Sequence, residues 1–505
     1  MEISYIDLAI IVAYLIIVAL IGSLSGGKQR STSDYFMGGK NVPWWAVSFS
    51  IVAAETSSLT FISIPGLAYI TNLNFLQLTI GYLIARILVA TFFLPAYREG
   101  QLVTAYNFLE NRFGANTRKY ASSVFLFTRV AADGVRLFST AIPLALIFKV
   151  IPAFYNWQDF NVYALSIMII AAVSFIYTFT GGIKGVIWAD VLQMVVYIGG
   201  AIMAIWILTN HLPATFSLTS LGNKTEIFNL NFGETIHSFF SQPYTLIGSL
   251  VGGIFLSMAS HGTDQLIVQR LLTTKSLKDS QKAIIGSGIM VMIQFFLFLV
   301  VGLLLYVFFN GIALSDPVSP FNKPDEIFPY FIIHNLPTGV KGFIIAGLFA
   351  AALSTLAGSI TSLSSSAMLD LYKPLFGKTD DPAKELKISR MLTIFWAVVL
   401  TCVAFLFITV QQSVVEIALG IASITYGGLL GTFLLGLFFK QVDQKSAITG
   451  FTSGIVAMLL IIIIPRLLGM PALVHWTWFV VIGTTVTIVI GISIQRLRLW
   501  MGDRI

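Results

Sequence analysis

Long apolar stretches recur along the whole chain and set the first expectation about its architecture. Each is close to the 20 residues or so that an α-helix needs to cross the hydrocarbon core of a bilayer. We therefore expect an all-α, polytopic membrane protein in which residues 1–505 form a single transmembrane domain in contact with the lipid bilayer. The predicted spans are thirteen: residues 5–24, 44–71, 75–96, 120–151, 161–180, 186–209, 244–260, 283–311, 340–371, 389–409, 413–438, 444–465 and 477–497.

Composition agrees with this pattern. The chain is 56% hydrophobic and 10% charged, with a mean hydropathy of +0.86, whereas soluble domains carry about 25% charged residues. The net charge of +7 does not indicate nucleic acid as a partner, because the basic residues follow the membrane topology. A single cysteine, Cys402, excludes a disulfide within the chain. The first apolar stretch lacks a basic leader and a small-residue cleavage site, so we expect a retained span.

The basic residues between the spans predict the orientation. One set of alternate loops holds 22 of the 30 lysines and arginines and the opposite set holds 5. The remaining three, Arg86, Arg129 and Arg136, fall within spans. By the positive-inside rule, we expect a multi-pass protein of the inner (plasma) membrane with its N-terminus outside and its C-terminus in the cytoplasm.

The second span carries an ionisable residue among hydroxyl groups. Glu55 lies in a segment that ends in Pro65-Gly66, and a charge at membrane depth marks an ion or substrate path by default. We expect the helix to break around residues 53–58, which would free main-chain carbonyls for sodium. The alternative is an unbroken helix whose small residues pack closely. The hydroxyls are those of Ser50, Thr56, Ser57, Ser58 and Thr60.

The ninth span offers a second set of oxygens. Ala351, Ser354 and Thr355 have the spacing i, i+3, i+4 and therefore share one helix face,. Two hydroxyls and a carbonyl on that face would make half of a cation site. Tight packing through small residues explains the pattern equally well.

The seventh span contains Gly252-Gly253, which predicts a second mid-helix break. Paired interrupted helices in corresponding positions of two halves indicate a transporter site. In the fourth span Asp133 and Arg136, at i and i+3, are expected to pair. Asp190 opens the sixth span and is a candidate for a second ion site or an ion exit path, or a cap for a neighbouring helix.

Enzymatic and ATP-driven functions have little support in the sequence. The five histidines are scattered without metal-ligand spacing, and no phosphate-binding loop is present,. We therefore expect a protein that is not an enzyme.

Three stretches together resemble the solute:sodium symporter family. They are Asp34-Tyr-Phe-Met-Gly-Gly39, Gly181-Gly-Ile-Lys-Gly-Val-Ile-Trp-Ala-Asp190, and Gly262-Thr-Asp-Gln-Leu-Ile-Val-Gln-Arg270 followed by 350–372. The resemblance implies a leucine-transporter-like core of two inverted five-helix repeats, here residues 44–438. Residues 1–43 would then be an extra N-terminal helix and cytoplasmic loop, and 439–505 two extra C-terminal helices.

The resemblance also implies a sodium site. Its main-chain oxygens fall on Ala53, Thr56 and Ala351, and its hydroxyls on Ser354 and Thr355. Members of the family that carry sialic acid have a second sodium site, whose hydroxyl positions correspond here to Ala357 and Gly358. Because these residues lack hydroxyls, we expect one sodium per cycle, although Asp190 matches the acid of that second site.

These observations predict a sodium-coupled symporter that imports a small organic solute by alternating access. Candidate solute residues, chosen by position and chemistry, are Glu55, Ser57, Thr60, Gly81 and Arg136. Two alternatives stay open: a proton-coupled symporter with Glu55 as the carrier, and a solute sensor that does not transport. The sequence does not choose among sugars, sialates, carboxylates and amino acids, nor does it indicate an oligomeric state.

Overall fold

The computed structural model describes residues 3–100, 102–151, 154–214, 216–231, 233–377, 381–408 and 414–502. The elements in these ranges are helices. The α-helices are α1 (Tyr5–Ser25), α2 (Thr32–Met37), α3 (Trp44–Glu55), α4 (Ser58–Ile70), α5 (Leu76–Leu88), α6 (Leu94–Glu99), α7 (Tyr106–Phe113), α8 (Ala115–Val150), α9 (Asp159–Asn210), α10 (Ile236–Ser241), α11 (Leu246–Met258), α12 (Gln265–Leu272), α13 (Leu277–Phe308), α14 (Pro324–Asn335), α15 (Val340–Ser366), α16 (Lys373–Phe376), α17 (Pro382–Leu406), α18 (Val414–Phe438), α19 (Gln444–Leu467) and α20 (Phe479–Trp500).

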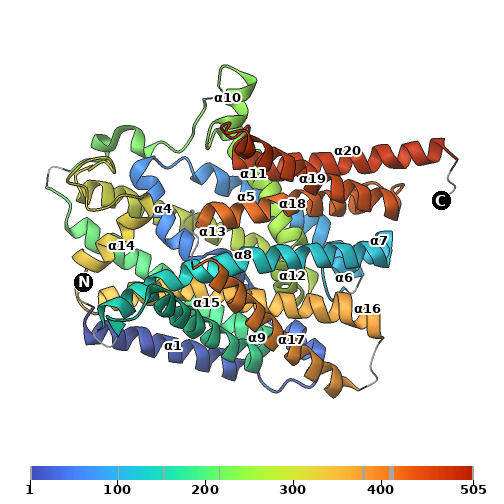
Figure 1. The fold of residues 1–505 in the computed structure, drawn as a ribbon, viewed down its shortest axis with the longest axis horizontal. Coiled ribbons are helices and arrows are strands. Elements are labelled where there is room, and N and C mark those ends of the chain that lie inside the picture. Colours follow the sequence, from blue (N-terminus) through green and yellow to red (C-terminus); the bar gives the residue numbers. More distant parts are fainter. Residues whose placement is uncertain are drawn as a thin grey trace.

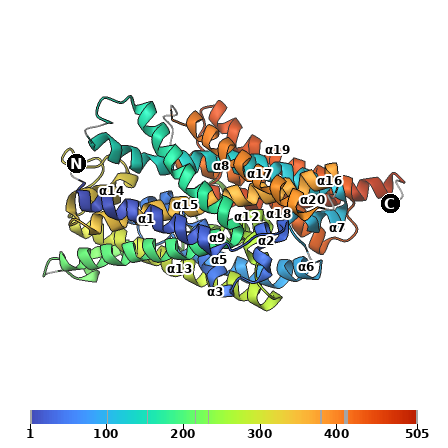
Figure 2. The same cartoon turned by 90° about the horizontal axis from the view of Figure 1, so that it is seen from below.

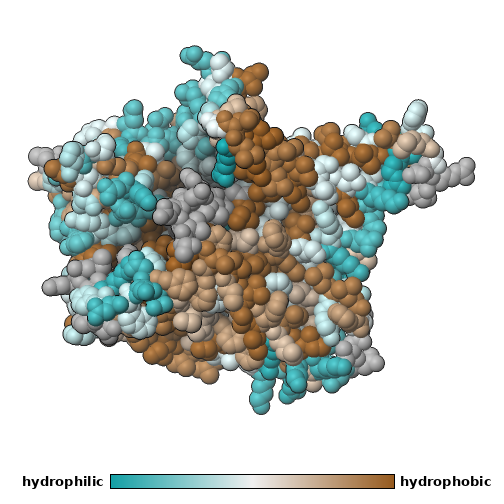
Figure 3. Space-filling model, in the orientation of Figure 1, coloured by the Kyte–Doolittle hydropathy of each residue, from teal (hydrophilic) through white to brown (hydrophobic). Residues whose placement is uncertain are grey.

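The long helices run side by side along the long axis of the molecule, and the two termini lie at opposite ends (Figures 1 and 2). Hydrophobic side chains cover the middle of the face in Figure 3, and hydrophilic side chains gather toward both ends. This distribution fits a bundle that crosses a bilayer along its long axis.

Among the described residues, eleven helices are long and apolar enough to span a membrane, and the bent pair α3–α4 brings the number to twelve. The 52-residue α9 accounts for the thirteenth, because its backbone is not helical at Gly182 (φ 57°, ψ −161°). Tyr177 and Asp190 would be about 20 Å apart along a straight helix. In the structure they contact neighbouring residues of α15, Leu353 and Ser354. The chain thus folds back at Gly182, and the predicted all-α architecture is confirmed.

Close backbone contacts fix the first helix against the bundle. A side chain on Gly181 or Gly185 of α9 would lie 2.2 or 2.1 Å from the carbonyl oxygen of Gly22 in α1. At the other end of α1, the buried Asp7 carboxylate accepts hydrogen bonds from the main-chain nitrogens of Gly339 and Gly342, at 2.7 and 2.9 Å. A carboxylate at the start of α15 is stabilised by the helix dipole.

One predicted break is misplaced. Gly252 and Gly253 lie inside the continuous α11, where they permit close contact with Thr477 and with Leu78 and Gly81. The interruption comes later, in a π-helical turn, η5 (Ala259–Thr263), and at the extended residue Asp264 before α12. Small residues serve close packing as well as unwinding, and here packing is their role.

Substitution of Gly185 tests the α1–α9 contact. Gly185→Ala would force α1 away from α9, and overpacking of this kind costs about 1–3 kcal/mol. We expect a lower midpoint of thermal unfolding for the purified protein. Gly199 of the same helix has no atom nearer than 3.5 Å to an added methyl, so Gly199→Ala should leave the midpoint unchanged. Equal midpoints for the two variants would contradict the packing shown here.

Candidate functional site

The second predicted span is broken at Thr56 and Ser57. Both residues have extended backbone angles (φ −78°, ψ 111° and φ −95°, ψ 165°), and α3 and α4 meet there at 65°. The Ser57 side chain accepts a hydrogen bond from the Thr60 main-chain nitrogen at 3.3 Å and caps α4, a role for which serine is well suited. The break predicted within residues 53–58 is confirmed.

Unwinding leaves main-chain oxygens at the end of α3 without their helical partners. The Val52 oxygen accepts from the Thr56 nitrogen and hydroxyl, at 3.0 and 2.8 Å. No described residue donates a hydrogen bond to the oxygens of Ala53 and Thr56. These are two of the oxygens expected to bind sodium. An unpaired buried carbonyl carries a large desolvation penalty, which a bound cation would remove.

The three predicted residues of α15 are buried, and α15 packs against both α3 and α4. The Ser354 hydroxyl donates to an oxygen of Asp190 at 2.6 Å, and the Thr355 hydroxyl donates to the Ala351 oxygen at 3.1 Å. With their hydrogens committed in this way, both hydroxyl oxygens keep lone pairs for a hard cation.

Asp190 lies directly behind this hydroxyl pair. Its carboxylate accepts from Ser50 of α3 and from the guanidinium of Arg270 in α12, the latter at 3.0 Å. Arg270 is only 1% exposed. Arg270 neutralises the charge of Asp190. Asp190 lies in the second arm of α9, and its contacts join that arm to α3 and α12 beside Ser354.

A small cavity adjoins the break. Its volume is about 10 Å³, enough for about one water molecule. Ser57 and Arg136, two of the predicted solute residues, line it together with Thr355 and Thr140. An organic solute does not fit this space until the surrounding helices move apart.

The other predicted solute residues lie elsewhere. Thr60 is next to Ser57, with their hydroxyl oxygens 3.3 Å apart, but it is not among the residues lining the cavity. Gly81 lies in the contact between α5 and α11, where an added methyl would be 2.7 Å from the Leu250 oxygen. A packing role therefore accounts for Gly81.

Glu55 belongs to a separate buried cluster. Its Oε2 pairs with the fully buried Arg86 of α5 and lies 3.5 Å from Nε2 of His261 in η5. Arg86 also donates to the Ser287 hydroxyl of α13 at 2.8 Å. The Glu55 side chain retains 20% exposure. This cluster joins both interrupted helices to α5 and α13.

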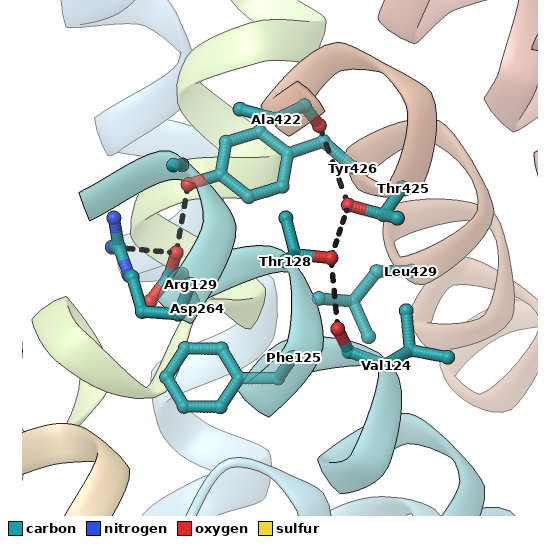
Figure 4. A pocket seen from close by; sticks show the side chains of 10 residues that line it. Val124, Phe125, Thr128, Arg129, Asp264, Ala422, Thr425, Tyr426 and Leu429 are labelled. Carbon is teal, nitrogen blue, oxygen red and sulfur yellow. Dashed lines mark hydrogen bonds and ion pairs between the residues drawn. The ribbon is translucent and has the colours of Figure 1, made fainter. Parts of the chain in front are cut away.

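A second cluster of charges begins at the cavity, which Arg136 and Asp133 line. Arg136 pairs with Asp133 at 3.2 Å, as the spacing predicted. Asp133 lies 3.5 Å from Arg129, and Arg129 pairs at 2.9 Å with Asp264 at the start of α12. Tyr426 of α18 donates to the same Asp264 oxygen at 2.7 Å (Figure 4). Arg136 is 26% exposed, while Asp133 is almost fully buried.

Polar contacts between α8 and the helix that begins with α15 continue from this cluster to a second cavity. That cavity, of about 620 Å³, lies among α2, α7, α16 and α17. It has room for a small organic molecule. The polar pairs on the way are Ser359 with Asp133, Ser366 with Ser122 at 2.7 Å, and Asp370 with Arg118 at 2.8 Å.

The sequence profile of the Sodium:solute symporter family matches residues 35–454. The chain belongs to the sodium:solute symporter family. As a member it is a sodium-coupled multi-pass membrane transporter of a small solute, and the family consists of transporters. The recognition and the predicted function are confirmed at this level.

Similar proteins place the chain within this family. It is 29% identical to the sodium/sialic acid symporter SiaT of Proteus mirabilis (strain HI4320), over 91% of this chain and 90% of that protein. It is 27% identical to the sodium/glucose cotransporter of Vibrio parahaemolyticus, over 93% and 87%. A Na+-coupled sialic acid symporter solved in a substrate-bound outward-open state has a TM-score of 0.84 and 26% identity, over 98% of each chain. Mhp1, a nucleobase-cation-symport-1 family transporter, has a TM-score of 0.60 at 12% identity and 94% and 95% coverage. Both structures support the predicted leucine-transporter-like fold.

The Glu55–Arg86 pair gives a test of the interior electrostatics. Removing one partner of a buried ion pair costs about 3–5 kcal/mol, whereas removing both charges can cost far less. We therefore expect Arg86→Met to lower the unfolding midpoint more than the double variant Glu55→Gln with Arg86→Met. A double variant at least as unstable as Arg86→Met would show that the two charges do not depend on each other.

Proposed function

We propose that this protein imports a small organic acid together with one sodium ion. The proposal rests on the break between α3 and α4. There, the carbonyls of Ala53 and Thr56 have no donor among the described residues, and the hydroxyls of Ser354 and Thr355 on the adjacent α15 keep lone pairs. The cavity beside this break is lined by Arg136. The sodium ligands would be the main-chain oxygens of Ala53, Thr56 and Ala351 and the hydroxyls of Ser354 and Thr355.

Arg136 supports an anionic solute. It is a partly exposed guanidinium at membrane depth, and among the described residues it donates one hydrogen bond, to Asp133 at 3.2 Å. Arginine binds carboxylates with two parallel hydrogen bonds, and donors remain free for that purpose. The names of relatives include sialic acid and monocarboxylates, both of which carry a carboxylate.

Proton coupling through Glu55 has less support. Arg86 and His261 already surround the Glu55 oxygen, so the carboxylate is neutralised without a proton. Glu55, Ser57 and Thr60 instead would bind polar groups of the solute once the cavity enlarges, since all three keep partial exposure. A sensor without transport is not supported, because the family to which the chain belongs consists of transporters.

The topology completes the proposal. We infer an inner (plasma) membrane location with the N-terminus outside and the C-terminus in the cytoplasm, based on the basic loops. The opposite positions of the termini agree with an odd number of spans (Figure 1). The inverted-repeat core would comprise residues 44–438, flanked by the extra helices in 1–43 and 439–505.

Uptake by reconstituted vesicles tests the function. We expect sodium-dependent accumulation of at least one acid from a panel of sialic acid, pyruvate and lactate, and none of glucose. One sodium with one monoanion moves no net charge, so an imposed potassium diffusion potential should not change the rate. Each uncompensated charge would instead contribute about 2.3 kcal/mol per 100 mV.

Arg136→Gln should abolish uptake of the acid. Uptake that follows pH and ignores sodium would favour proton coupling, and uptake of glucose alone would refute the anionic solute. A rate that rises with an inside-negative potential would show that a second sodium moves with the acid.

The sodium ligands are tested separately. Loss of one hydroxyl ligand removes an interaction with a charge worth about 1.5–3 kcal/mol, so Ser354→Ala and Thr355→Ala should each raise the sodium concentration for half-maximal uptake by about tenfold or more. Ser364→Ala, in the same helix, is the control, because its buried hydroxyl bonds only the Ile360 oxygen among the described residues. An unchanged sodium dependence in both Ser354→Ala and Thr355→Ala would exclude the site.

A further inference from the structure

Asp264 connects the second interrupted helix to two other helices. Its Oδ1 accepts from the Leu266 main-chain nitrogen at 2.9 Å and so caps α12. Its Oδ2 accepts from both Arg129 of α8, at 2.9 Å, and the Tyr426 hydroxyl of α18, at 2.7 Å. Figure 4 shows these two donors meeting at one oxygen. The position of the start of α12 therefore depends on which donors hold this carboxylate.

Asp133 is shared between two arginines and also accepts from the Ser359 hydroxyl of α15. Arg129 lies 3.5 Å and Arg136 lies 3.2 Å from its oxygens, both longer than the usual 2.7–2.9 Å or so of a charge-assisted bond. Going from the cavity inward, the charges alternate in sign: Arg136, Asp133, Arg129, Asp264. The three inner groups are at most 8% exposed, and in such surroundings a change at one charge is felt strongly by the next.

We propose that this row of four charges transmits binding of an anion at Arg136 to the start of α12. A carboxylate bound to Arg136 takes the place of Asp133 as its partner. Asp133, which keeps its hydrogen bond from Ser359, then draws closer to Arg129, and this weakens the contact between Arg129 and Asp264. The solute cavity and the second interrupted helix thereby become linked sites, and the linkage acts in both directions. The inference rests on the anionic solute proposed above, but it assigns a role to Asp133, Arg129 and Asp264, which are not proposed as ligands of that solute.

Tyr426 offers a way to change the far end of the row. Its hydroxyl and Arg129 both donate to one Asp264 oxygen, so Tyr426→Phe should strengthen the bond from Arg129 to Asp264. Arg129 then moves away from Asp133, and Asp133 binds Arg136 more tightly. An anion that binds Arg136 must displace this stronger partner. We expect the dissociation constant of the bound acid to rise about three- to tenfold, the usual effect of one hydrogen bond. The probe is whichever acid among sialic acid, pyruvate and lactate gives the largest sodium-dependent thermal shift.

The decisive measurement is a double-mutant cycle with Asp133→Asn. Without the charge at position 133 the row is interrupted, so Tyr426→Phe should change the dissociation constant of the acid less than twofold in the Asp133→Asn background. Sodium affinity measured without acid should be the same in Tyr426→Phe and in the unmodified protein, because the sodium site lies outside the row. A merely structural defect would lower both affinities.

Thr425→Val is the matched control. Thr425 accepts from Thr128 at 3.1 Å, and this contact joins the same two helices next to the row without a charge (Figure 4). An equal loss of acid affinity in Thr425→Val, or an undiminished effect of Tyr426→Phe in the Asp133→Asn background, would overturn the proposal. If Asp133→Asn does not fold, the comparison of acid affinity between Tyr426→Phe and Thr425→Val decides. A loss of affinity in Tyr426→Phe alone supports the proposal. If no acid of the panel binds the unmodified protein, the proposed function fails and this inference with it; if an acid binds normally to every variant, only the inference fails.

Discussion

The bilayer core supplies no water to a polar group, and most features of this structure follow from that constraint. A carbonyl or a charge within the spans must find its partner in the protein. Asp7 therefore meets two main-chain nitrogens of α15, and Asp190 meets Arg270 and two serines. Several buried polar side-chain atoms among the described residues nevertheless lack a partner. Around the break between α3 and α4, the carbonyls of Ala53 and Thr56 also lack a donor, and the Arg136 guanidinium bonds only Asp133 among the described residues.

The charged clusters explain why interrupted helices remain stable inside the bundle. Each break is bordered by a carboxylate: Glu55 at the end of α3 and Asp264 at the start of α12. Each carboxylate is held by an arginine of a continuous helix, Arg86 in α5 and Arg129 in α8. The helix ends are thus anchored by ion pairs rather than by the helical hydrogen bonds that the breaks remove. A broken helix anchored in this way can tilt when its ion pairs rearrange, without exposing free polar groups to lipid.

The sequence predicts this architecture well wherever a property is local. Apolar length predicts the spans, and the hydroxyl-rich stretch around Glu55 predicts the first break. The break predicted at Gly252-Gly253 was wrong because a glycine pair can either unwind a helix or allow a neighbouring segment to pack closely against it. The sequence alone does not separate these two roles, whereas the positions of α5 and Thr477 in the structure do. The partners of Glu55 and Asp190 could not be named, since they lie far away in the sequence. The sequence placed Arg86 and Arg129 within spans but predicted a partner for neither. Arg270 was not recognised as the partner of Asp190, because it lies near the end of α12.

The two cavities suggest how solute and sodium depend on each other. The cavity beside Arg136 holds about one water, whereas the one among α2, α7, α16 and α17 is about sixty times larger. Between them α8 and the helix that begins with α15 are joined by side-chain pairs, which favour movement of these two helices as one unit. Enlargement of the first cavity would then come from the other side, where Ser57 and Ser58 at the start of α4 line it. The carbonyls proposed to bind sodium lie at the end of α3, and the proposed hydroxyl ligands lie on α15. In this proposal a cation between them would hold the end of α3 against α15, while α4 moves relative to both. Sodium at the break would thereby fix the point about which α4 opens the cavity, and sodium and an acid at Arg136 would favour each other without direct contact.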